Sequence, residues 1–176
     1  GFGTGGYCIP LSSQYVLNQV KNKASLTLLR ETVKTDKLIN LKIARSIVNK
    51  KCKKVAVLGL SYKGNLKVSI LSPVIPFVKE LRRKKINVKV YDPFYSSKEI
   101  KKILGTNSFK FPEQLKDFDC IVIAADHDKF KINNKLIKRY LTKNSFILDF
   151  FGIWKKHNLN KLGKKYLISG NKNWLD

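Results

Sequence analysis

From Lys53 onward, short apolar runs alternate with segments of helical periodicity, and this alternation constrains the fold more than any other feature of the chain. The run VAVL at 55–58, closed by Gly59, is typical of a parallel strand that is buried on both faces. The pattern predicts an α/β fold, a Rossmann-like open parallel sheet with helices on both faces. Further strands are expected at 88–91, 120–124 and 146–149, and helices at 73–84, 97–104 and 134–141.

Ligands of an open parallel sheet bind beyond the carboxyl ends of its strands. In this sequence we expect that edge to be formed by residues 59–65, Asp92, residues 126–128 and the segment that starts at Asp149. A functional site is therefore expected where these four segments meet.

The chain opens on a glycine-rich run, GFGTGGYCIP, in which a thiol directly follows the glycines. Glycine lets backbone amides approach a ligand closely, so Cys8 is a candidate nucleophile beside an anion site. The alternative is a flexible arm with an incidental cysteine. Because Pro10 disfavours an immediate helix, Ser12 or Ser13 is expected to cap one long helix, or two nearly continuous ones, that extends to Asn49.

Two glycine patterns have the spacing of a dinucleotide-binding fingerprint, and neither fulfils it. The pattern at 1–6 has no strand before it, and the pattern at 59–64 carries Ser61 where the fingerprint has the glycine that meets a pyrophosphate. Tyr62 and Lys63 follow, and a lysine can reach a phosphate as a point charge while tyrosine offers a ring or a hydroxyl. We expect a nucleotide diphosphate held by the lysine here rather than NAD.

Composition limits the classes of function. The net charge of +24, from 36 Lys and Arg against 12 Asp and Glu, attracts polyanions. The basic residues are spread along the whole chain without a nucleic-acid-reading motif, so nucleic-acid binding is only a remote alternative. Three cysteines and two histidines show no metal-ligand spacing, and we expect no metal site. No apolar run reaches the length of about 20 residues that a membrane span requires, and a cytoplasmic protein without a membrane partner is expected.

Four motifs, in order, resemble those of the UDP-glucose/GDP-mannose dehydrogenase family. The opening run is similar to the family's catalytic-cysteine loop, Gly-x-Gly-x-Gly-Gly-(Tyr/His)-Cys-x-Pro. The other three are LGLSYKGN at 58–65 with Ser72-Pro73, VYDP at 90–93 and ADHDKF at 125–130. The resemblance implies an NAD-dependent enzyme that oxidises the C6 alcohol of a UDP-sugar, UDP-glucose or a UDP-N-acetylhexosamine, to a carboxylate in two hydride transfers.

The resemblance also implies roles for individual residues. Cys8 is the implied nucleophile, which forms a thiohemiacetal and then a thioester, and Ser12 stands where the family has an aspartate. Because a serine hydroxyl is no carboxylate base near neutral pH, a UDP-sugar-binding relative with impaired catalysis is the alternative. The residues implied in substrate binding are Gly1, Phe2, Gly3, Thr4, Gly5, Gly6, Tyr62 and Lys63.

The implied organisation has two parts. Residues 1–52 would hold the cysteine loop and a central helix used in homodimer formation, and residues 53–176 a Rossmann-like UDP-sugar-binding domain. The family's N-terminal NAD-binding domain would lie outside this sequence. We expect the sequence to be a fragment, since it has no methionine and opens inside a motif. The expected partners are the UDP-sugar and a second copy of the chain.

Overall fold

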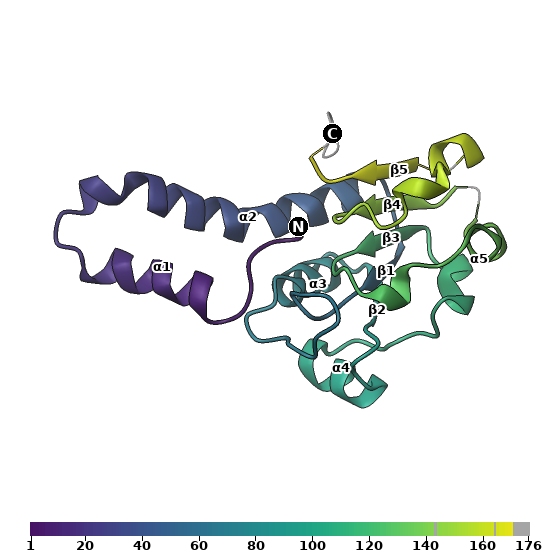
Figure 1. The fold of residues 1–176 in the computed structure, drawn as a ribbon, viewed down its shortest axis with the longest axis horizontal. Coiled ribbons are helices and arrows are strands. Elements are labelled where there is room, and N and C mark those ends of the chain that lie inside the picture. The colour runs from purple at the N-terminus through teal and green to yellow at the C-terminus, as the bar shows by residue number, and fades with distance from the viewer. Residues whose placement is uncertain (143, 164, 171–176) are drawn as a thin grey trace.

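The computed structural model describes residues 1–142, 144–163 and 165–170. Its centre is a parallel sheet of five strands in the order β2-β1-β3-β4-β5 (Figure 1). The strands are β1 (Lys54–Leu58), β2 (Asn87–Tyr91), β3 (Cys120–Ile123), β4 (Phe146–Asp149) and β5 (Lys165–Ile168). The predicted open parallel sheet is confirmed, and β5 is a strand that the sequence analysis did not predict.

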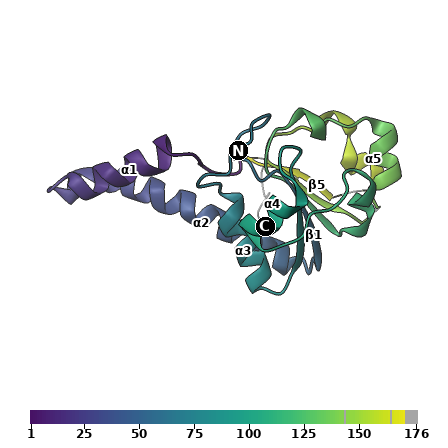
Figure 2. The same cartoon turned by 90° about the horizontal axis from the view of Figure 1, so that it is seen from below.

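Helices cover both faces of the sheet (Figure 2). The α-helices are α1 (Cys8–Gln19), α2 (Thr27–Asn49), α3 (Val74–Arg83), α4 (Ser97–Leu104) and α5 (Asn134–Tyr140). Single turns of 3-10 helix lie at Lys23–Leu26, Glu113–Asp117, Asp128–Phe130, Lys155–His157 and Leu159–Leu162. The bounds predicted for the helix at 97–104 agree with those of α4, which Ser96 and Glu99 cap at its start and Gly105 closes in the left-handed conformation.

The two faces of the sheet belong to two separate apolar cores because successive strand residues point to opposite sides. In β1, Val55 and Val57 join the core that packs on α2, α3 and α4, whereas Ala56 and Leu58 join the core on the side of α5. These four side chains are fully buried, and only Lys54, the first residue of β1, is exposed. This burial on both faces explains why the strands appear in the sequence as continuous apolar runs rather than alternating ones.

The helical region before the sheet is a hairpin, not one long helix or two nearly continuous ones. The chain leaves α1 at Val20 in an extended conformation, makes a 3-10 turn and returns as α2, which lies beside α1 (Figure 1). The side chain of Asn22 accepts a hydrogen bond from the Ala24 N–H at 3.2 Å and so stabilises the reversal. Periodicity alone does not reveal such a turn, because the apolar spacing continues on both sides of it.

The start of α1 corrects two further expectations. Helix α1 begins at Cys8, so Pro10 lies in its first turn, where a residue without an N–H breaks no intrahelical bond. Ser12 and Ser13 therefore lie inside the helix and do not cap it. The Ser13 hydroxyl instead donates to the Ile9 carbonyl at 2.9 Å.

Strand β5 is held to the sheet by a buried carboxylate. Asp149, at the end of β4, accepts hydrogen bonds from the Phe151 N–H (3.0 Å), the Trp154 N–H (2.9 Å) and the Tyr166 hydroxyl (2.7 Å). Burial and the adjacent Asp149 charge raise the pKa of Tyr166, so its hydroxyl stays protonated as a donor. Among the described residues, no helix is long and apolar enough to cross a membrane.

Candidate functional site

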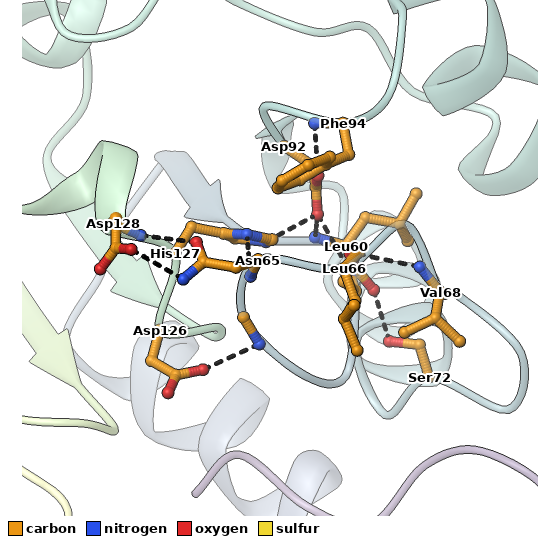
Figure 3. Close-up of polar contacts among 12 residues, drawn as sticks. Leu60, Asn65, Leu66, Val68, Ser72, Asp92, Phe94, Asp126, His127 and Asp128 are labelled. Atoms are coloured by element: carbon orange, nitrogen blue, oxygen red, sulfur yellow. Dashed lines mark hydrogen bonds and ion pairs between the residues drawn. The ribbon is translucent and has the colours of Figure 1, made fainter.

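The carboxyl ends of β1, β2 and β3 meet around Asp92, the residue that follows β2 (Figure 3). Its side chain is buried, and its Oδ2 accepts hydrogen bonds from the N–H groups of Leu60 (2.8 Å) and Ser61 (2.9 Å). Its Oδ1 accepts a third from the Phe94 N–H at 3.0 Å. One carboxylate therefore fixes the loop after β1 against the end of β2.

His127, in the loop after β3, is the fourth donor to Asp92. The Nδ1 atom of His127 accepts a hydrogen bond from the Asn65 N–H at 2.9 Å, so the ring proton belongs on Nε2, which lies 3.2 Å from Asp92 Oδ2. Burial opposes the ionisation of Asp92, but the hydrogen bonds from His127, Ser61, Phe94 and Leu60 outweigh it and hold the Asp92 pKa below its usual value. The Nε2–H of His127 thus faces an ionised carboxylate that has hydrogen-bond donors on both of its oxygens.

A second set of contacts clamps the tip of the loop after β1 (Figure 3). The Gly64 N–H donates to Asp126 Oδ1 at 2.8 Å, and the side chain of Asn65 exchanges two hydrogen bonds of 2.9 Å with Asp128. Asn65 adopts a positive φ of 58°, which asparagine tolerates better than most residues. A Cβ atom on Gly64 would lie 2.4 Å from Asp126 Oδ1, so no other residue fits there without displacement.

Internal hydrogen bonds fix the shape of the same loop. Ser61 Oγ donates to the Leu66 carbonyl and Ser72 Oγ to the Leu60 carbonyl, both at 2.7 Å. Lys63 lies exposed near the tip of this rigid loop. Within the described part of the chain its ammonium group has no hydrogen bond or ion pair, so it can bind an anion from solution.

The loop after β1 does not fit a dinucleotide. In a dinucleotide fold, the amides of this turn point at the pyrophosphate, whereas here those of Leu60, Ser61 and Gly64 donate to protein carboxylates. Asp92 and Asp126 would also repel a phosphate placed at those amides. The expectation that this turn does not hold NAD stays a prediction, which the engagement of these three amides supports.

The N-terminal glycine run packs directly on the loop after β1. The Gly6 N–H donates to the Ile70 carbonyl at 2.9 Å. A Cβ on Gly5 would lie 2.5 Å from Tyr62 Cβ, and one on Gly6 would lie 2.8 Å from Tyr62 Oη. The glycines are required because the tyrosine side chain lies against their backbone, so part of the surface that we expected Tyr62 to offer a ligand contacts the glycine loop instead.

The rest of the glycine loop is held by α2 and by the core. Thr4 donates to Asp36 on α2 through its N–H (3.1 Å) and its hydroxyl (2.7 Å). The Phe2 ring is buried edge-on between Phe77 and Phe150, with ring centroids 5.1 and 4.7 Å away. Its side chain is therefore not available to a substrate, and only its backbone could line one. Sequence reasoning missed Asp36, because an acidic residue on a largely exposed helix carries no recognisable signal.

Cys8 and Ser12 project from the exposed start of α1. Cys8 is the first residue of the helix and Ser12 lies one turn later, a spacing that places both on the same face. A hollow of about 540 Å³ lies between the glycine loop and α2, lined by Gly1, Gly3 and Asp36 among others. This volume is within the range of about 300–1,000 Å³ that is typical of small-ligand pockets. No group of His, Cys, Asp and Glu side chains suited to a metal occurs among the described residues.

A parallel sheet covered by helices on both faces, with the candidate site at its carboxyl edge, defines an α/β domain of the Rossmann-like class. Comparison with known families gives the same answer in finer detail. Residues 56–156 match the UDP binding domain of the UDP-glucose/GDP-mannose dehydrogenase family. The chain therefore belongs to this family.

Individual relatives agree with this assignment. A UDP-N-acetyl-D-mannosamine dehydrogenase of Methanocaldococcus jannaschii is 31% identical over 98% of this chain and 40% of its own length. A UDP-glucose 6-dehydrogenase of Rickettsia prowazekii is 30% identical over 97% of this chain and 41% of its own length. The chain thus spans about two fifths of the length of these curated relatives.

Solved structures show the same fold. The UDP-D-ManNAc dehydrogenase of Pyrococcus horikoshii superposes with a TM-score of 0.66 and 26% identity, over 87% of this chain and 36% of that one. An NDP-N-acetyl-D-galactosaminuronic acid dehydrogenase of Methanosarcina mazei gives a TM-score of 0.74 at 17% identity, over 99% of this chain and 40% of that one. The second likeness is one of fold alone.

Proposed function

We propose that this chain is the substrate-binding, cysteine-bearing part of an NAD-dependent UDP-sugar 6-dehydrogenase. The observation that supports this most is the packing of Gly5 and Gly6 on Tyr62, because it joins the Cys8 loop to the loop that presents Lys63. A nucleotide diphosphate bound at Lys63 would then place its sugar toward the loop that carries Cys8. The sugar is UDP-glucose or a UDP-N-acetylhexosamine.

In this proposal Lys63 binds the diphosphate. Its charge is unpaired within the described residues, and it stands on a loop whose conformation is already fixed, so little ordering free energy is lost on binding. Tyr62, beside it, both supports the glycine loop and borders the ligand. The backbone of residues 1–6 lines the sugar nucleotide, although the N–H groups of Thr4 and Gly6 are already engaged within the protein.

Cys8 is the proposed nucleophile. Its sulfur adds to the C6 aldehyde, a C–S bond forms, and the carbonyl oxygen takes up a proton to give a thiohemiacetal, which keeps the reactive aldehyde bound. Loss of a second hydride, which NAD would accept, would convert the thiohemiacetal to a thioester, and water would cleave this to the carboxylate and the free Cys8 thiol. Ser12, one turn along α1, is placed near this chemistry but cannot act as a carboxylate base. That substitution is the observation that favours the second candidate, a UDP-sugar-binding relative with impaired turnover.

NAD supplies the oxidising chemistry of such enzymes, and we propose that it is held mainly by a domain outside these 176 residues. In the loop after β1, backbone N–H groups that a dinucleotide would need already donate to Asp92 and Asp126, which supports this assignment. We also propose a homodimer formed through the α1–α2 hairpin. Its exposed apolar side chains, such as Tyr15 and Leu28, would become buried in that contact.

Calorimetric titration with UDP tests the proposed binding site. We expect Lys63→Ala to weaken UDP binding by about 1.5–3 kcal/mol, the range for a hydrogen bond to a charged group, which corresponds to roughly 10- to 150-fold in Kd. The matched control is Lys84→Ala, which removes an exposed lysine at the end of α3 and should change the affinity little. Equal affinities for wild type and Lys63→Ala would place the nucleotide elsewhere.

The same titration separates binding from catalysis. Cys8→Ala should leave UDP affinity unchanged, since the thiol acts on the sugar and not on the nucleotide. In the enzyme that also carries an NAD-binding domain, Cys8→Ala should abolish NADH formation from a UDP-sugar. Unchanged turnover would remove Cys8 from the mechanism. A wild-type protein that binds UDP-sugar and forms no NADH would favour the impaired relative.

A further inference from the structure

The proposed function uses one of the three cysteines, and the other two form a pair at the opposite, amino-terminal edge of the sheet. Cys52 follows the end of α2, and Cys120 is the first residue of β3. Both cysteines are free thiols, and their side chains lie within hydrogen-bonding reach of each other.

Asp119 and the sheet hold the segments of the two thiols together. Asp119, next to Cys120, accepts hydrogen bonds from the N–H groups of Lys53 (2.9 Å) and Lys54 (3.0 Å). The Asp119 N–H donates in turn to the Lys54 carbonyl at 3.1 Å. In the sheet, Val55 of β1 is paired with Cys120 of β3. The segments that carry the cysteines are thus fixed side by side by the Asp119 carboxylate and by the main-chain bonds of the sheet, none of which involves a sulfur atom.

The two thiols differ in access. Cys52 lines a cavity of about 600 Å³, together with Lys50, Lys51, Asp119 and Lys165. Cys120 is fully buried and does not line this cavity. A small reagent that enters the cavity therefore meets Cys52 first.

The two thiols also differ in acidity. The hydrogen bond from Cys120 lowers the pKa of Cys52, and the charge of Lys50 acts in the same direction, against the opposing effects of burial and of Asp119. Burial raises the pKa of Cys120. Cys52 is therefore the thiol of the pair that more readily becomes a thiolate, and the thiolate is the reactive form.

We propose that Cys52 is a site of oxidation by hydroperoxides and that Cys120 resolves the oxidised sulfur as an intramolecular disulfide. The Cys52 thiolate attacks one peroxide oxygen: the S–O bond forms, the O–O bond breaks, and the departing hydroxide takes a proton and leaves as water. The Cys120 sulfur then attacks the Cys52 sulfenic acid, whose S–O bond breaks and whose hydroxyl leaves as water with the Cys120 proton. Two thiols are oxidised to one disulfide, and hydrogen peroxide is reduced to two waters.

Peptide mapping by mass spectrometry tests this proposal. The protein is used as a Cys8→Ser variant, so that the exposed third thiol does not contribute, and it is treated with hydrogen peroxide after removal of reductant. Free thiols are then alkylated. We expect a peptide pair linked through Cys52 and Cys120, lighter by two hydrogens than the reduced pair, which dithiothreitol releases. Recovery of both cysteines as alkylated free thiols, at a peroxide dose that oxidises Cys8 in the wild-type protein, would overturn the proposal.

Single variants test the order of events. With Cys120→Ser added, the proposal predicts that Cys52 stops at the sulfenic acid, which dimedone traps. With Cys52→Ser added, Cys120 should resist the same peroxide dose because it is buried. Oxidation of Cys120 in a Cys52→Ser protein whose circular dichroism matches the parent would contradict the assigned roles. If a double variant fails to fold, peptide mapping of the Cys8→Ser protein still shows whether the disulfide forms.

Discussion

At the scale of single residues, the candidate site depends on side chains whose size or charge state cannot change without loss. Gly64 lies against the Asp126 side chain and main chain, and Asp92 accepts four hydrogen bonds in a buried position. The first position is constrained by space and the second by charge. Separate substitutions therefore test the two constraints.

Gly64→Ala should destabilise the fold by about 1–3 kcal/mol, the range for overpacking. Its Cβ would lie 2.4 Å from Asp126 Oδ1 and 2.5 Å from the Asp126 carbonyl oxygen, and the latter is main chain that cannot rotate away. The midpoint of urea unfolding measures the effect. Gly1→Ala is the matched control, because the nearest atom to its Cβ would be 4.0 Å away. Equal midpoints for the two variants would mean that the loop relaxes freely.

Asp92→Asn should lower the unfolding free energy at pH 7 by about 1.5–3 kcal/mol, the range for hydrogen bonds to a charged group. The folded-state pKa of Asp92 lies below its usual value, so its contribution is present above about pH 4 and is lost as the pH falls through the folded pKa. Urea unfolding at successive pH values should therefore show the gap between wild type and variant narrowing in acid. A difference in unfolding free energy that stays constant as the pH falls would show that the charge of Asp92 does not stabilise the fold. Asp117→Asn, at an exposed carboxylate, serves as the control.

At the scale of secondary-structure elements, the sequence predicts best those that are buried on both sides. The runs at 55–58 and 146–149 appear as continuous apolar strands because two cores cover them. Strand β5 lies at the edge and has one buried residue, so its sequence lacks that signal. The reversal between α1 and α2 escapes prediction because it depends on Asn22 and on packing, not on periodicity.

Tyr166→Phe tests how β5 is held. Removal of the hydroxyl takes one hydrogen bond from the buried Asp149 carboxylate, so we expect a loss of about 1.5–3 kcal/mol in unfolding free energy. The loss of unfolding free energy should be near the lower end of this range, because two backbone N–H groups still donate to Asp149. In Tyr166→Phe the amides of β5 should also exchange with solvent faster than in the wild type. Tyr140→Phe, at a partly exposed tyrosine of α5, is the control, and an equal effect there would show that the Asp149 contact contributes little.

At the scale of the whole molecule, the site is assembled from segments that are far apart in the sequence. Gly6 and Tyr62 meet only because the α1–α2 hairpin returns the N-terminal loop to the sheet. Motif resemblance predicted both segments, but strand and helix patterns could not predict their contact. Strand and helix patterns also could not predict that Asp92 and His127 would accept hydrogen bonds from backbone N–H groups of the loop after β1, the groups that a dinucleotide needs.

Ligand-dependent melting tests the arrangement as a whole. UDP at about 100 times its Kd should add about 2.7 kcal/mol of stability. For a chain of this length, each kcal/mol raises Tm by about 2–4 °C, so a rise of roughly 5–10 °C is expected. NAD at the same concentration should leave Tm unchanged. A comparable rise of Tm with NAD would contradict the proposal that NAD is held mainly by a domain outside these 176 residues. A rise of Tm with RNA that disappears at high salt would indicate only non-specific attraction to the net charge of +24.

The contacts around Asp92 also set the order in which this site can come into being during synthesis. The loop after β1 leaves the ribosome first, yet its Asn65 N–H binds a histidine 62 residues further along the chain. At about 5–20 residues per second, that histidine is made roughly 3–12 s later. Throughout that interval the hydrogen bonds that Gly64 and Asn65 make to residues 126–128 cannot form, although the bonds within the loop after β1 can. A pause in translation between the codons of Asn65 and His127 would therefore prolong the time for which this part of the newborn chain is open to proteases and chaperones.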